Sequence, residues 1–147
     1  MIGLVTDSNA QLPGDLRERY QVAVVPLTVV VDDHPYQEGV DITAAEFYER
    51  LAAGASVSTA APSPGAVLTA IDQARSAATH GAVVIMGGGD VIGQALEQGL
   101  VDELRLHVAP MVLGGGTPLF KRGTRQMYQQ RDVRPSRNAV HLTYERV

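Results

Sequence analysis

AVVIMGGGD, at residues 82–90, is the stretch that decides the fold. Its five leading apolar residues predict a strand buried on both faces, and the glycines at 87–89 allow a tight turn after it. Asp90 is expected to cap a helix that reaches Gln98, and Gly99 ends that helix. An apolar strand that turns directly into a helix is typical of α/β proteins with a parallel sheet.

The first half of the chain shows the same alternation of strands and helices. Apolar residues predict strands at 1–5 and 22–31, and Pro26 indicates a bend or an edge position in the second strand. Residues 36–40 are predicted to form a short return strand. Helices are predicted from Pro13 to about Tyr20, from a capping box at Thr43 and Glu46 to Gly54, and from the Ser63 cap through Pro64 to about Ala78.

The chain ends in a segment rich in predicted strands. A strand at residues 104–113 is broken by a second glycine triplet at 114–116, and residues 127–133 and 139–146 predict two further strands joined by a turn. Only three residues separate the two halves, which favours one shared sheet. We therefore expect an α/β fold: a single three-layer domain at residues 1–147, with a mostly parallel central sheet, flanking helices and antiparallel C-terminal strands.

Length and composition limit the function classes. The chain has 147 residues, of which 45% are hydrophobic and 19% are charged, enough for one sizeable core. It has no cysteine, which excludes a disulfide, a thiolate nucleophile and a zinc–sulfur site. The histidines show no metal-ligand spacing, so no metal is expected, although His107 and His141 are predicted to share a sheet face. The longest apolar run, at 22–31, is too short for a membrane span, and no signal-peptide pattern opens the chain, so we expect a cytoplasmic protein.

The net charge of −4 is unevenly distributed. Residues 1–78 hold ten acidic and four basic side chains, and residues 79–147 hold six acidic and eight basic ones. A solvated surface explains the basic excess, and an attraction for phosphate is the alternative. Because no aromatic residues or nucleic-acid motifs are interleaved, neither DNA nor RNA is expected as a partner. Most of the basic residues follow Leu119: Lys121, Arg122, Arg125, Arg131, Arg134, Arg137 and Arg146.

Several ordered motifs in the first half carry a resemblance to a known family. They are Val5-Thr6-Asp7-Ser8, Val24-Val25-Pro26-Leu27, Gly39-Val40-Asp41-Ile42 with Phe47-Tyr48, and residues 59–64. Through them, residues 1–78 are similar to the N-terminal part of the DegV family of bacterial fatty-acid-binding proteins. The resemblance implies that hydroxyl groups hold a fatty-acid carboxylate, some of them from the loop at residues 58–63.

The lipid site that this resemblance implies is altered. The family usually has Thr-Ser-Gln-Pro-Ser where this chain has Thr59-Ala60-Ala61-Pro62-Ser63, and the family's later serine-rich loop and second, lipid-covering domain have no counterpart. The resemblance therefore supports structure more than lipid binding. The candidate lipid-binding residues are Asp7, Ser8, Thr59 and Ser63, and turn and cap chemistry is the alternative role for Thr59 and Ser63.

The second half resembles another family. The matching residues are Val84-Ile85-Met86-Gly87-Gly88-Gly89, Leu96, the run at 99–104, Pro110, the run at 113–116, and Leu119-Phe120. Residues 81–147 are similar to the C-terminal part of the dihydrofolate-reductase-like family, which includes the reductase domain of the riboflavin-pathway enzyme RibD. The resemblance implies that the first glycine triplet lies beside the phosphates of NADP(H), with Gly87, Gly88, Gly89 and the backbone of Val91 and Ile92 as the cofactor-binding candidates.

A tight turn with no ligand is the alternative role for the first glycine triplet. The strands that shape the nicotinamide and substrate pockets in the reductase family are missing from this chain. The carboxylate of Asp90 would also compete with a phosphate for the N–H groups at the start of the helix. Asp102 and Glu103 are expected to begin a strand rather than to act as an acid–base pair, so no catalytic residue is assigned.

Two partial resemblances leave three function classes open. The first is a stable scaffold without retained activity, since the sharp junction suggests a chimera that was engineered or recombined, with a natural fusion as the alternative. The second is an NADP(H)-binding module of reductase type, which as an enzyme would be an NADPH-dependent reductase. The third is a fatty-acid-binding module of DegV type. A homodimer through exposed strand edges at residues 104–113 or 139–146 is also expected.

Overall fold

The computed structural model describes residues 1–116, 118–120 and 125–147. The chain divides into two compact units, Met1–Gln94 and Ala95–Val147. Helices and strands alternate along most of the chain, so the predicted α/β class is confirmed. The single composite domain, with halves at residues 1–78 and 79–147, stays a prediction. Within the described part of the chain, no helix combines the length and the apolar character that a membrane span needs.

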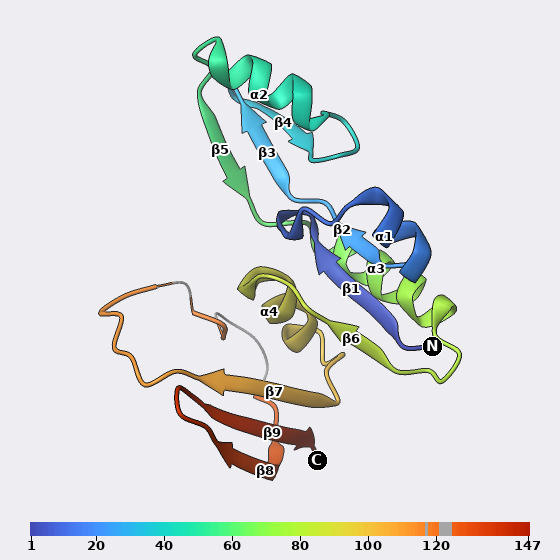
Figure 1. Ribbon diagram of the computed structural model, residues 1–147, viewed down its shortest axis with the longest axis vertical. Coiled ribbons are helices and arrows are strands. Elements are labelled where there is room, and N and C mark those ends of the chain that lie inside the picture. Colours follow the sequence, from blue (N-terminus) through green and yellow to red (C-terminus); the bar gives the residue numbers. More distant parts are fainter. Residues whose placement is uncertain (117, 121–124) are drawn as a thin grey trace. The chain divides into compact units, whose positions relative to one another are not determined.

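The first unit is built on a parallel sheet with the strand order β2-β1-β6 (Figure 1). Its strands are β1 (Gly3–Asp7), β2 (Ala23–Val25) and β6 (Val83–Ile85). The short 3-10 helix η1 (Ser8–Ala10) and α1 (Gly14–Tyr20) lie between β1 and β2 in the chain, and α3 (Pro64–Ala77) precedes β6. Because β6 follows the predicted junction and pairs with β1, residues from both halves of the sequence share this sheet.

Apolar side chains of the parallel sheet and α3 form the main core of this unit. Val5, Val25 and Val67 are at most 1% exposed. A glycine in β1 lets α3 approach the sheet at backbone distance: a Cβ built on Gly3 would lie 2.2 Å from the carbonyl oxygen of Ala74. The close packing of α3 on β1 therefore requires glycine at position 3, since any other residue would force a shift of the backbone.

A second sheet in the same unit is antiparallel, with the order β4-β3-β5. It contains β3 (Thr28–Val31), β4 (His34–Gln37) and β5 (Val57–Ala60), and α2 (Ala44–Ala52) lies between β4 and β5 in the chain (Figure 1). Its small core consists of Val29, Val31 and Ile42, with Phe47 of α2 packed against it. These elements form a lobe, residues 28–60, that continues from the parallel sheet.

The apolar run at residues 22–31 is not one strand, as the sequence predicts, but two strands in different sheets. The break falls at Pro26 and Leu27, between β2 and β3. Pro26 has no N–H to donate to a ladder, and the N–H of Leu27 donates to the Ser8 hydroxyl instead, at 3.0 Å. The predicted bend at Pro26 is thus confirmed. Across the described residues, the expected mostly parallel sheet is corrected to one parallel sheet and two antiparallel ones.

The second unit contains an antiparallel sheet with the order β7-β9-β8. Its strands are β7 (Glu103–Val108), β8 (Tyr128–Pro135) and β9 (Val140–Arg146), which confirms the predicted antiparallel C-terminal strands. The strand predicted at 104–113 ends at Val108, and β9 is the central strand rather than an edge. The homodimer stays a prediction, with β7 and β8 as the edges of this sheet. Lys121 and Arg122 of the predicted basic stretch lie outside the described residues.

Among the described helices, α2 and α3 start at the predicted signals, whereas α1 begins at Gly14 with Pro13 at the cap position rather than in the first turn, and α4 (Gly89–Glu97) also differs. The Thr43 side chain accepts from the N–H of Glu46 in a full capping box, and the Ser63 side chain caps α3 ahead of Pro64, as predicted. The helix α4 begins one residue before Asp90, because the carbonyl of Gly88 accepts its first hydrogen bonds. Asp90 therefore lies within the first turn of α4 and not at the cap position.

Candidate functional site

The carboxyl ends of β1 and β6 form the natural ligand position of the parallel sheet. The chain leaves β1 for β2 on one side and later adds β6 on the other, so the order of the strands reverses between β1 and β6. In open parallel sheets, ligands bind beside such a reversal, at the carboxyl ends of the strands. Asp7 and Ser8 lie at the end of β1, and Gly87 and Gly88 follow β6. Two candidate sets predicted from different halves of the sequence thus meet here.

A buried carboxylate occupies the centre of this position. Asp7 is 6% exposed, and its Oδ2 accepts the backbone N–H of Gly88 at 2.6 Å. A Cβ built on Gly87 or Gly88 would lie 3.2 or 3.1 Å from the same oxygen. The glycines are therefore explained by the close approach of Asp7, and a short hydrogen bond to an ionised carboxylate is a strong one.

Three of the backbone N–H groups predicted to lie beside the NADP(H) phosphates already donate hydrogen bonds within the protein. Gly88 donates to Asp7, and the N–H groups of Val91 and Ile92 donate to the Gly88 carbonyl at 3.1 and 3.3 Å. A phosphate at this loop would meet the negative charge of Asp7 and would compete for the Gly88 N–H. The geometry weighs against the dinucleotide site, which stays a prediction.

Ser8 is also held within the protein. Its hydroxyl donates to Glu38 Oε2 at 2.6 Å and accepts from the N–H of Leu27 at 3.0 Å. The other oxygen of Glu38 accepts from the Gln11 side chain at 3.1 Å. This network ties the end of β1 to the lobe. The network gives Ser8 a structural role, and ligand contact by Asp7 and Ser8 stays a prediction.

Thr59 and Ser63 present hydroxyl groups that remain able to donate. Thr59 lies in β5, not in a loop as predicted, and it is exposed directly opposite Val29 of β3. Among the described residues, its hydroxyl makes no side-chain hydrogen bond. The Ser63 oxygen accepts from the N–H of Ala66 at 3.2 Å, which leaves the hydroxyl proton for another acceptor. Both cap chemistry and ligand binding are compatible with this arrangement of Ser63.

The start of α3 favours a negative group near Ser63. This helix has 14 residues, and its first turn contains no acidic side chain. The partial positive charge at a helix N-terminus is therefore not offset locally and favours an anion. The preceding residue is held in place from α4, since the Gln94 side chain donates to the Pro62 carbonyl at 2.8 Å. Sequence reasoning missed Gln94 and Glu38, because neither lies in a motif and their partners are distant in the chain.

Comparison with known proteins places this arrangement in a family. Residues 1–87, more than half of the chain, match the family described as "Uncharacterised protein, DegV family". The match runs past the junction at residues 79–81 and includes β6. The chain belongs to the DegV family. A chimeric origin for the remainder stays a prediction.

Individual relatives support this membership. A DegV domain-containing protein of Caldanaerobacter subterraneus subsp. tengcongensis is 30% identical over 126 residues, which cover 82% of this chain and 45% of that protein. The crystal structure of a stearic-acid-binding protein from Eubacterium ventriosum superposes with a TM-score of 0.56 at 30% identity, covering 68% of this chain and 36% of that one. The chain therefore spans less than half the length of these two relatives.

The reductase resemblance is supported at the level of the fold. A pyrimidine reductase-like protein from Corynebacterium diphtheriae superposes with a TM-score of 0.59, covering 99% of this chain and 75% of that one, at 18% identity. An identity this low shows a shared fold and carries no activity to this chain.

Proposed function

We propose that residues 1–94 recognise the carboxylate of a fatty acid, as one part of a fatty-acid-binding protein of DegV type. The observation that carries this proposal is the family match over residues 1–87, together with a 30% identical relative described as a stearic-acid-binding protein. The hydroxyl groups of Thr59 and Ser63 are the proposed donors to the carboxylate.

Three features of β5 and the start of α3 support this role. Thr59 is exposed, Ser63 keeps a hydroxyl proton to donate, and α3 adds the positive end of a helix without an acid in its first turn. Hydrogen bonds to an ionised group are stronger than neutral ones, so the Ser63 hydroxyl at the helix start, with the Thr59 hydroxyl from the end of β5, is the proposed carboxylate site. Asp7 and Ser8 hold the neighbouring β1 end and do not contact the lipid in this proposal.

One pocket among the described residues of this unit is too small to enclose an acyl chain. This pocket, beside Val29 and lined also by Ile42, Phe47 and Glu38, has a volume of about 50 Å³. Ligand pockets usually have roughly 300–1,000 Å³. Residues 1–94 are therefore proposed to bind the head group, with most of the acyl chain outside this pocket.

A pair of substitutions at the cap position tests the proposal. Aspartate caps a helix as well as serine does, so Ser63→Asp should leave stability nearly unchanged while placing a negative charge at the proposed carboxylate position. We expect Ser63→Asp to lower palmitate affinity at least tenfold, and Ser63→Thr to preserve it. Thr59→Val, which removes one hydroxyl from an exposed strand position, should weaken binding by a smaller factor.

Binding is measured by displacement of a fluorescent fatty acid below the micellar concentration. Hexadecanol is the matched ligand control, because it has the same chain length without the carboxylate, and NADPH is tested in parallel by thermal shift. Equal palmitate affinity in the parent and Ser63→Asp proteins would refute the proposed head-group position. Concentration-dependent stabilisation by NADPH alone would favour the reductase-type function instead.

A further inference from the structure

We propose that His107 and His141 form a binding site for a divalent transition metal ion of the class that prefers imidazole ligands, with Zn²⁺ as the representative. The pair lies on the antiparallel sheet of the second unit, far in sequence from the fatty-acid site proposed above. The two histidines are 34 residues apart, which is why their spacing shows no metal-binding pattern.

The sheet register brings the two rings together. His107 of β7 lies directly opposite His141 of β9, and their Nδ1 atoms share a hydrogen bond of 2.5 Å, which a bound ion would replace. The ring centroids are 4.7 Å apart with an interplanar angle of 71°, in an edge-to-face arrangement. Directly opposite side chains in an antiparallel pair have close Cβ atoms, so both nitrogens can reach one ion. Neutral imidazole nitrogen is the commonest protein ligand for such metals.

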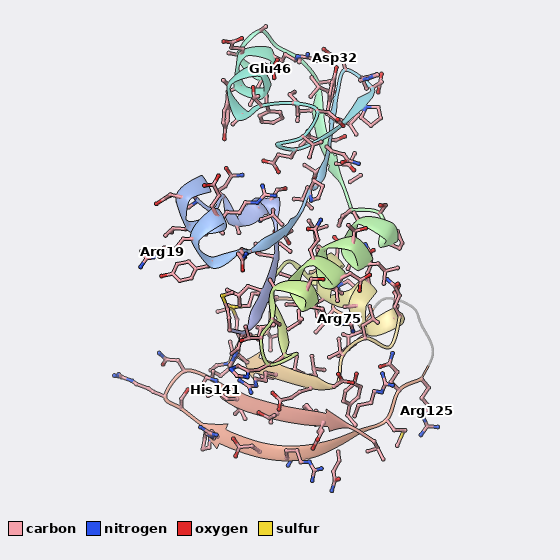
Figure 2. The ribbon with its side chains drawn as sticks, turned by 90° about the vertical axis from the view of Figure 1, so that its right-hand side faces the viewer. Arg19, Asp32, Glu46, Arg75, Arg125 and His141 are labelled. Atoms are coloured by element: carbon pink, nitrogen blue, oxygen red, sulfur yellow. The ribbon has the colours of Figure 1, made fainter. Side chains whose placement is uncertain are left out.

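A hydrogen bond to the second nitrogen of His141 fixes the orientation of that ring. His141 Nε2 lies 3.1 Å from the Ser136 hydroxyl, and Ser136 is held in the β8–β9 turn by a hydrogen bond from its N–H to the Ala139 carbonyl at 2.8 Å. Metal-binding histidines usually have their second nitrogen hydrogen-bonded in this way, which fixes the orientation of the ring. The label of His141 in Figure 2 marks this position on the sheet.

Solvent can complete the coordination of the ion. His107 is exposed and His141 is half-buried. Within the described residues, no group of three or more His, Cys, Asp or Glu side chains could hold a metal, so two imidazoles and water molecules are the proposed ligands. Zinc–nitrogen bonds of about 2.0–2.1 Å in tetrahedral geometry require the nitrogens to separate to about 3.4 Å, so the proposal includes a rotation of the exposed His107 ring.

The positive charge of a nearby arginine is the main factor that opposes cation binding. Arg134 lies opposite His141 on β8, and its guanidinium is paired with Asp132 at 2.5 Å. This pair offsets the repulsion between the arginine and a bound cation. Replacement of Arg134 by glutamine should therefore change Zn²⁺ affinity by less than the loss of either histidine.

Zn²⁺ titration of the full chain tests the site, with calorimetry for affinity and two-dimensional ¹H–¹⁵N spectra of the imidazole rings for the ligand atoms. His107→Gln and His141→Gln should each weaken Zn²⁺ binding at least tenfold, and the double variant should weaken it no further, because a single histidine cannot chelate. His80→Gln is the control and should bind as the parent does. Both Nδ1 resonances of the parent should shift on binding.

Three results would overturn the proposal: Zn²⁺ affinity that is unchanged in His107→Gln, shifts confined to one ring, or no saturable binding below millimolar Zn²⁺. Circular dichroism of each variant establishes that the sheet is retained. Since palmitate binding at Ser63 is not involved, failure of this site leaves the proposed function intact, and the reverse also holds.

Discussion

Asp7 Oδ2 accepts the backbone N–H of Gly88 at 2.6 Å, across 81 positions of sequence. The carboxylate is buried, and a Cβ built on Gly87 or Gly88 would lie 3.2 or 3.1 Å from its Oδ2, a tight contact. The contact joins the end of β1 to the turn that begins α4. It also puts a negative charge where a dinucleotide phosphate was predicted.

The first prediction concerns the two neighbouring glycines. Gly88→Ala should lower the free energy of unfolding by about 1 kcal/mol, because its Cβ would lie 3.1 Å from Asp7 Oδ2 and the buried carboxylate would have to move slightly. Gly89→Ala is the matched control, since no atom lies within 4 Å of a Cβ built there. Urea unfolding of both variants measures the difference.

The second prediction tests whether Asp7 is the cause. Asp7→Ala should lower the free energy of unfolding by about 1.5–3 kcal/mol, the usual contribution of a hydrogen bond to a charged group. In the Asp7→Ala background, Gly88→Ala should have a much smaller effect, because the crowded oxygen is gone. Additive losses in the double variant would show that Gly88 is constrained by something other than Asp7.

A third prediction concerns the packing of α3 on β1. Gly3→Ala should lower the free energy of unfolding by about 3 kcal/mol, since the new Cβ would lie 2.2 Å from the Ala74 carbonyl oxygen, a backbone atom that cannot rotate away. Gly14→Ala at the start of α1 meets nothing within 4 Å and should be neutral or slightly stabilising. Equal stability of the two variants would contradict the close approach of α3.

The fourth prediction is a pH dependence from the capping box of α2, where Glu46 is labelled in Figure 2. Hydrogen bonds from the backbone and side chain of Thr43 hold the pKa of Glu46 below its usual value of 4.5. Because the folded pKa is the lower one, this stabilisation is fully present above the unfolded pKa and is lost as the pH falls through the folded pKa. NMR titration of the Glu46 carboxyl carbon should show the lowered pKa, and Thr43→Ala should return it toward 4.5.

A fifth prediction locates the boundary of the first unit. A fragment of residues 1–98 should fold cooperatively, because it keeps β6 beside β1 together with α4. A fragment of residues 1–78 lacks β6 and should be unfolded or aggregated, since β1 then has an unpaired edge beside the core. Equally sharp thermal transitions for both fragments would show that the first 78 residues fold without the strand after the junction.

Local signals in the sequence were sufficient for several elements. The capping box at Thr43, the Ser63 cap and the turn before β9 all form as predicted, since each depends on hydrogen bonds between residues at most four positions apart. Strand ends were less predictable. The run at 22–31 divides between two sheets, and β5 forms at residues expected to be a loop, because pairing partners decide both outcomes.

The candidate site shows the same division. The sequence indicated Asp7, Ser8, Thr59, Ser63 and the glycine triplet as separate sets, and the comparisons with known proteins support the DegV family for residues 1–87. It could not indicate that Asp7 would occupy the glycine turn, or that Ser8 would be held by Glu38. In both contacts the two residues are far apart in the sequence, so no local sequence pattern predicts the hydrogen bond.

By itself, the sequence determined the α/β class and the helix caps at Thr43 and Ser63, because periodicity and capping act over a few residues. Only the tertiary structure decided that the carboxyl ends of β1 and β6 meet, and that His107 and His141 face each other across two strands. The physical reason is that strand pairing sets a register between distant segments. If the pairing of two strands were shifted by one residue, different side chains of the same sequence would lie opposite each other.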